Sequence, residues 1–124
     1  MNTEQEWDNL AFEIHETNVK HGFWESNNTA EKLMLIVTEL AEACEADREK
    51  RYFKGKIHGI MNFNDEAFLS AFVLNVKDTF EDELADAVIR IIDLSIGKNF
   101  DLMAHIQAKA RFNKSRPYKH NKEY

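Results

Sequence analysis

Two pairs of carboxylates, Glu39 with Glu42 and Glu83 with Asp86, stand three residues apart within the most apolar stretches of the chain. In a helix, a step of three residues rises about 4.5 Å and keeps both side chains on nearly one face. Four converging carboxylates repel one another unless a cation lies among them. Because no histidine or cysteine belongs to the set, a hard cation is favoured, and we predict that all four bind Mg²⁺ or Mn²⁺.

Helical packing must bring these pairs together. Each pair lies on the shoulder of an apolar stripe, in segments 33–46 and 80–94. The stripes contain Leu33, Ile36, Val37, Leu40, Ala43 and Cys44 in the first segment, and Phe80, Leu84, Ala87, Val88, Ile91 and Ser95 in the second. We expect the stripes to pack together with the carboxylates at the edge of their interface. The alternative for a single acidic pair is a solvated helix face, since the chain has 22 Asp and Glu residues.

Other metal and phosphate motifs are absent from the sequence. No histidine follows a glutamate by three residues, as the ferritin-like di-iron bundles require. There is no HExxH zinc motif, no glycine-rich phosphate loop ending in Lys-Ser/Thr, and only one cysteine.

The end of the chain is basic. Residues 109–124 hold six Lys or Arg against one acid, a net charge of +5, whereas residues 1–108 hold ten basic and twenty-one acidic residues, a net charge of −11. The acidic body argues against polymeric nucleic acid as a partner, because such binding depends on phosphate contacts. In the tail, Lys109 and Asn113 share a helical face and Arg116 follows, a set that suits a small phosphorylated ligand. The alternative is a frayed terminus that only offsets the acidic body.

Hydrophobic periodicity and capping residues predict four main helices, over residues 5–21, 29–51, 79–97 and 101–113. Asn28 and Asp101 are the expected N-caps of the second and last helices, and Asp78 or Thr79 that of the third. Residues 52–77 form an insertion between the two metal-binding helices, with one short helix from Asn64 through Phe72 and loop around His58-Gly59. The predicted fold is therefore one all-α domain, residues 1–124, with a four-helix-type bundle.

The cysteine count and the apolar segments of the sequence indicate a cellular compartment. The chain has a single cysteine, no N-terminal export signal and no long apolar run, so we expect a cytoplasmic protein that does not span a membrane.

The order of these motifs resembles the MazG-like superfamily of all-α nucleoside triphosphate pyrophosphohydrolases. The matching residues are Glu39-x-x-Glu42, then Glu83-x-x-Asp86 within EDELADAVIRIIDL, then the ending KARFNKSRPYKH, with IHETNVKHGFW as the opening. The gap between the acidic pairs is longer than in compact family members, and Asn121 stands where a glycine often follows the histidine.

The resemblance implies Mg²⁺-dependent cleavage of nucleoside triphosphates between the α and β phosphates, giving a monophosphate and pyrophosphate, in a house-cleaning role on the nucleotide pool. Glu39, Glu42, Glu83 and Asp86 would be the catalytic and metal-binding residues, with one of them free to act as general base. The substrate-binding residues are expected to be Lys109, Asn113, Arg116, Tyr118, Lys119, His15 and Trp24.

A nucleobase pocket is one interpretation of the cluster His15, Asn18, Phe23 and Trp24, although aromatic residues at such spacing also serve as ordinary core.

Apolar residues off the main stripes, including Met34, Leu35, Ile89 and Ile92, predict a homodimer or a dimer of dimers that buries them. The alternative function is a non-catalytic helical interaction module that binds metal incidentally. A basic tail with Lys109, Asn113 and Arg116 on a shared face favours the enzyme over the scaffold.

Overall fold

The computed structural model describes residues 2–123, without the side chains of residues 120 and 121, and this part of the chain is all-helical, as predicted. The elements in order are α1 (Thr3–Lys20), α2 (Thr29–Arg48), α3 (His58–Met61), α4 (Asp65–Asn75), α5 (Phe80–Gly97), α6 (Leu102–Lys114) and the 3-10 helix η1 (Tyr118–Asn121). The turn α3 occupies the segment around His58-Gly59, so the prediction of loop there is wrong.

Polar side chains cap the helices where the sequence predicts helix starts. Asn28 Oδ1 accepts a hydrogen bond from Glu31 N at 3.1 Å, and Asp101 Oδ1 accepts one from Ala104 N at 3.0 Å. Thr79, and not Asp78, is the N-cap of α5. Because each such cap is worth about 1 kcal/mol, the boundaries are set locally by the sequence.

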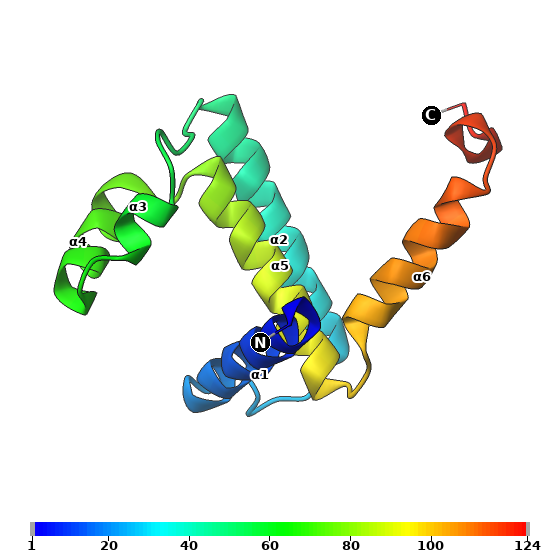
Figure 1. Ribbon diagram of the computed structural model, residues 1–124, viewed down its shortest axis with the longest axis horizontal. Coiled ribbons are helices and arrows are strands. Elements are labelled where there is room, and N and C mark those ends of the chain that lie inside the picture. The colour runs from blue at the N-terminus through cyan, green and yellow to red at the C-terminus, as the bar shows by residue number, and fades with distance from the viewer. Residues whose placement is uncertain (1, 124) are drawn as a thin grey trace.

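Helices α2 and α5 run antiparallel and form the central pair (Figure 1). Phe80 N donates to Arg51 O at 2.8 Å at one end of the pair, and Lys98 Nζ donates to Thr29 Oγ1 at 3.3 Å at the other. Small side chains let the two backbones approach closely. The buried residues of these two helices are Ile36, Glu39, Ala43, Ala46, Glu83, Ala87, Ile92, Asp93 and Ser95.

The prediction that the two apolar stripes pack against each other is confirmed only in part, because Ile36 and Ala43 on α2 and Ala87 and Ser95 on α5 are buried, whereas most of the bulkier stripe residues are not. Glu39 and Glu83 are buried in the helix pair, whereas Leu40 is 48% and Val88 49% exposed. Apart from the buried Ile36 and Ile92, many of the larger apolar side chains are exposed on both helices: Leu33, Met34, Val37, Leu40, Leu84, Val88, Ile89 and Ile91. Alanines at the contact face allow closer packing than these bulky side chains would, so the helices are rotated relative to the expected contact.

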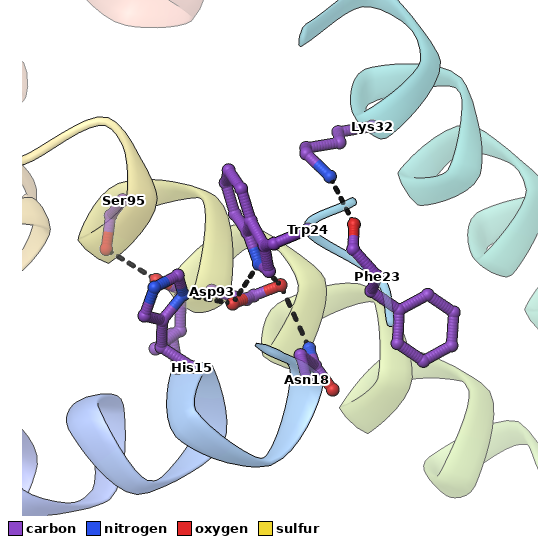
Figure 2. A network of polar contacts seen from close by, with 8 residues as sticks. His15, Asn18, Phe23, Trp24, Lys32, Asp93 and Ser95 are labelled. Carbon is purple, nitrogen blue, oxygen red and sulfur yellow. Dashed lines mark hydrogen bonds and ion pairs between the residues drawn. The ribbon is translucent and has the colours of Figure 1, made fainter. Parts of the chain in front are cut away.

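Helix α1 packs against α5 through the buried carboxylate of Asp93 (Figure 2). His15 Nδ1 lies 2.7 Å from Asp93 Oδ1, Asn18 Nδ2 donates to Oδ2 at 2.9 Å, and Trp24 Nε1 donates to both oxygens at 3.0 Å. Since a carboxylate only accepts, His15 Nδ1 carries a proton in this arrangement. A Cβ on Gly97 would lie 2.0 Å from the Trp24 ring, so this position requires glycine because the indole covers it.

Replacing Asp93 with alanine is expected to lower the free energy of unfolding by about 2 to 3 kcal/mol, because part-buried donors lose their acceptor. Urea denaturation of Asp93→Ala measures the change, and Asp101→Ala, which removes only a helix cap, is expected to cost about 1 kcal/mol. Equal losses in the two variants would contradict the structural role of the Asp93 network.

The remaining helices leave the central pair. Helices α3 and α4 pack on each other beyond the end where α2 stops, and α6 extends away from the other end (Figure 1). The expected packing of four main helices side by side is therefore not present within the described part of one chain. No helix among the described residues is long and apolar enough to cross a membrane.

Candidate metal centre

Three carboxylates from α2 and α5 meet in the helix pair. Glu39, Glu83 and Asp86 each offer one oxygen atom, and these atoms lie within 4.8 Å of one another. Glu39 and Glu83 are buried, and Asp86 is half-buried. The spacing of three residues between Glu83 and Asp86 places both on the side of α5 that faces Glu39.

The raised pKa of Glu83 shows that this site disfavours ionised carboxylates when no cation is bound. Burial, together with the neighbouring carboxylates of Glu42 and Glu39, raises the pKa of Glu83 from 4.5 to about 8. Burial and the charges of Asp82 and Glu39 likewise raise the pKa of Asp86 to about 6, against the opposing effect of Arg90. A group of positive charge in the site would remove this cost of ionisation.

The donor set fits a hard divalent cation. All three groups are carboxylates, the ligand type that Mg²⁺ and Mn²⁺ prefer. In addition, Glu83 Oε2 is a buried oxygen without a hydrogen-bond partner among the described residues. Such an atom is costly in a folded protein unless a ligand satisfies it. Glu39, Glu83 and Asp86 are therefore the residues that would hold the ion.

The fourth predicted ligand, Glu42, lies outside this close group and is exposed, although its carboxylate raises the pKa of Glu83. It therefore lies at the rim of the centre. A second acidic group consists of Asp78, Asp82 and Glu83. In this group Asp82 Oδ2 already accepts a hydrogen bond from Asp78 N, at 2.9 Å.

Without metal, the stability of the protein is expected to fall as the pH rises from about 4.5 to about 8, because Glu83 has its pKa raised on folding. Between these values the folded state binds more protons than the unfolded state, so the free energy of unfolding decreases with pH, by at most about 1.4 kcal/mol per unit for one group. Urea denaturation in chelator at pH 5.5 and pH 8 measures this. The slope should be smaller in Glu83→Gln than in wild type, and identical slopes would contradict the assignment.

Helix α6, which carries Lys109, Arg111 and Lys114, extends away from the central pair of α2 and α5 (Figure 1). Lys109 and Asn113 line one open hollow on α6, as their spacing predicts. Lys109 Nζ and Arg116 Cζ lie 4.9 Å and 5.5 Å from the centre of the Phe112 ring. Tyr118 is 87% exposed, and Lys119 lies beside its ring. The described part of the tail therefore forms a cationic surface that lies away from the carboxylate centre of its own chain.

His15 and Trp24 lie together, with their rings 5.1 Å apart at an angle of 70°. Their donors at Nδ1 and Nε1 are engaged by Asp93, so these atoms hold α1 to α5 (Figure 2). Beside them is a cavity of about 240 Å³, whose lining includes Phe23, Lys32 and Arg90.

Two central residues, Arg90 and Asp93, were not among the predicted site residues. Arg90 Nε donates to Glu39 Oε1 at 3.0 Å, which makes it the one cation paired with the carboxylate centre among the described residues. The sequence carried a signal for both: two charges stand within the apolar run RIIDL, and Arg90 follows Glu83 by seven residues, on the same helical face.

No protein-family model matches this chain, and no curated protein and no solved structure matches it either.

Proposed function

We propose that the protein hydrolyses nucleoside triphosphates between the α and β phosphates in a Mg²⁺-dependent reaction, releasing a nucleoside monophosphate and pyrophosphate. The observation that carries this proposal is the carboxylate centre, with a buried, unpartnered oxygen on Glu83. An oxygen-only site of this kind suits the metal that accompanies phosphate substrates.

The carboxylates and the basic tail divide the work of the reaction. Glu39, Glu83 and Asp86 hold the cation, while Lys109, Asn113 and Arg116 bind the phosphate oxygens. When bound, Mg²⁺ supplies neutralisation of phosphate charge and lowers the pKa of a coordinated water. Glu42, the carboxylate at the rim that is not among these ligands, accepts the proton as the water oxygen bonds to the α phosphorus. The bond from that phosphorus to the bridging oxygen breaks, and pyrophosphate leaves with that oxygen.

Assembly of two copies completes this site. No large side chain among the described residues is fully buried, and the apolar side chains left exposed on α2 follow heptad spacing at Leu33, Val37 and Leu40. Those on α5 repeat the pattern at Leu84, Val88 and Ile91. Two such pairs can pack as a four-helix bundle across a two-fold axis. The α6 of one copy then brings its cationic surface to the carboxylates of the other, and the separation of these groups within one chain supports this arrangement.

Heat denaturation with metal and nucleotide tests the proposal without relying on turnover. Mg²⁺ plus an α,β-imido nucleoside triphosphate should raise the melting temperature more than either alone, because a ligand that joins acidic centre and basic tail binds only the folded state. The expected stabilisation is about 2.7 kcal/mol at a ligand concentration of 100 times Kd. Glu45→Gln, an exposed substitution on α2, should respond like wild type, and no shift in either protein would count against the proposal.

A second candidate function is a helical interaction module, favoured by the exposed apolar face of α4. Leu69, Val73 and Leu74 line an open hollow there, and Leu74 is 82% exposed. Such a module needs neither Mg²⁺ nor the tail, so a thermal response that vanishes in Arg116→Ala distinguishes the two functions.

A further inference from the structure

Arg90 lies between the carboxylate centre and the cavity beside α1. On one side its Nε donates to Glu39 Oε1 at 3.0 Å, and both side chains of this ion pair are largely shielded from solvent. On the other side it lines the cavity of about 240 Å³, with its Cζ 5.7 Å from the centre of the Phe23 ring. One guanidinium thus borders two sites of opposite charge preference.

The pairing with Glu39 competes with metal binding. A cation bound by Glu39, Glu83 and Asp86 needs an oxygen of Glu39 and repels a guanidinium held at the same carboxylate. Arg90 is the only cation paired with this centre among the described residues, so it acts as the counter-ion of the centre when metal is absent.

Arg90 can also interact with a ligand in the cavity. A guanidinium has five N–H donors, and only the Nε–H of Arg90 has a protein partner within the described chain. Lys32 stands on the same cavity wall, where its Nζ donates to Phe23 O at 2.6 Å and lies 4.0 Å from the centre of the Trp24 ring (Figure 2). The acid Asp93 on this wall is already engaged by three donors, and Glu25 and Glu31 are exposed. Arg90 and Lys32 together therefore suit a phosphate group, which a guanidinium can bind through two parallel N–H donors.

We propose that Arg90 is a positioning residue that couples the two sites: it leaves Glu39 when a divalent cation binds and then holds a phosphate group of the ligand at the mouth of this cavity, together with Lys32. The proposal rests on the metal centre of the proposed function and adds its regulation. Each site then favours the other, since a metal ion frees the guanidinium and a bound phosphate keeps it away from Glu39. By linkage the effect is reciprocal, and coupling of this kind is typically about 5- to 150-fold in affinity.

Arginine side-chain NMR follows the proposed movement directly. In the wild-type protein with chelator, the Nε–H of Arg90 should exchange slowly with water because it is hydrogen-bonded and largely shielded; the signal is identified by its absence from Arg90→Lys. Saturating Mg²⁺ should speed this exchange. Inorganic phosphate, which binds free Mg²⁺ only weakly, should then slow it again and shift the signal, with no such effect when metal is absent. Arg48, which forms an exposed pair with Glu45 at 3.2 Å, is the internal control and should not respond.

Calorimetric Mg²⁺ titrations supply the second measurement. Arg90→Gln should bind Mg²⁺ more tightly than wild type in the absence of phosphate, because the competing cation is gone. Phosphate should tighten Mg²⁺ binding about 5-fold or more in wild type and in Arg48→Gln, and should have no effect in Arg90→Gln.

The outcomes separate this inference from the proposed function. If wild type binds Mg²⁺ while the Arg90 signal is unchanged, or if Arg90→Gln keeps the response to phosphate, the coupling role of Arg90 is overturned and the metal centre stands. If wild type gives no heat with Mg²⁺, the metal centre itself is overturned, and the inference falls with it.

Discussion

Replacing Glu83 with glutamine is expected to reduce Mg²⁺-dependent release of pyrophosphate by more than about 100-fold. Loss of a residue that only supports a metal ligand costs up to about 100-fold, and Glu83 is expected to be a ligand itself. Glu83 is the most buried carboxylate of the centre, and its Oε2 has no hydrogen-bond partner among the described residues. Glutamine keeps the shape of the side chain but is a poor ligand for Mg²⁺. Release is measured by a coupled assay for pyrophosphate.

The same substitution is expected to stabilise the metal-free protein. Above pH 8, where Glu83 is ionised because its pKa is about 8, an amide removes one buried charge, and its NH₂ group donates to the neighbouring carboxylates, a gain of about 1 to 3 kcal/mol at that pH. Urea denaturation in chelator measures it. Glu39→Gln should likewise lose activity and remain folded, since its amide oxygen still accepts from Arg90. Glu45→Gln is the matched control on the exposed face of α2, and full activity in either Glu83→Gln or Glu39→Gln would contradict the carboxylate site.

Mixing two inactive variants is expected to restore activity. In the proposed dimer, each site combines the carboxylates of one chain with the tail of the other, so Glu39→Gln and Arg116→Ala chains complement each other. Random exchange makes half of the dimers mixed, each with one intact site of two, so activity should recover to about a quarter of wild type.

Two controls make the mixing experiment decisive. Native mass spectrometry of chains with different isotope labels establishes that subunits exchange, and a mixture of Glu39→Gln with Glu83→Gln should remain inactive because neither chain has an intact centre. No recovery under proven exchange would place each site within one chain. A monomer in sedimentation at micromolar concentration would contradict the assembly itself.

The sequence predicted the helices well because the information is local. The capping side chains of Asn28, Thr79 and Asp101 bond to backbone three residues away, and no long-range contact is needed to define these starts. Gly97 shows the limit of local reasoning. The predicted helix over residues 79–97 ends at this residue, and Gly97 is the last residue of α5. The positive φ occurs at Asn99, however, and the need for glycine at position 97 comes from Trp24, distant in the sequence.

The packing of α2 on α5 could not be predicted in the same way. Both helices carry two faces able to bury apolar surface, one rich in alanine and one rich in leucine, valine and isoleucine. Periodicity favours the bulkier face, whereas the helices pair mainly through alanines, with one isoleucine on each helix, and bury Glu39 and Glu83 with them. Periodicity alone cannot choose between two such faces on one helix, and in the proposed dimer the second face is buried by the other copy.

Arg90 and Asp93 escaped prediction for a related reason. Each has its partners far along the sequence, Glu39 for Arg90 and His15, Asn18 and Trp24 for Asp93. A charge within an apolar run indicates only that a partner exists. Identifying that partner requires the crossing of α1 over α5 and the register of α2 against α5.

The central claim is tested most directly by the products formed from a panel of ribo- and deoxynucleoside triphosphates, with Mg²⁺ and with chelator. The carboxylate centre and the basic tail predict that at least one triphosphate yields equal amounts of monophosphate and pyrophosphate with Mg²⁺, and that chelator stops the reaction. Formation of diphosphate and orthophosphate, an equal rate in chelator, or no product from any triphosphate would contradict the proposed function.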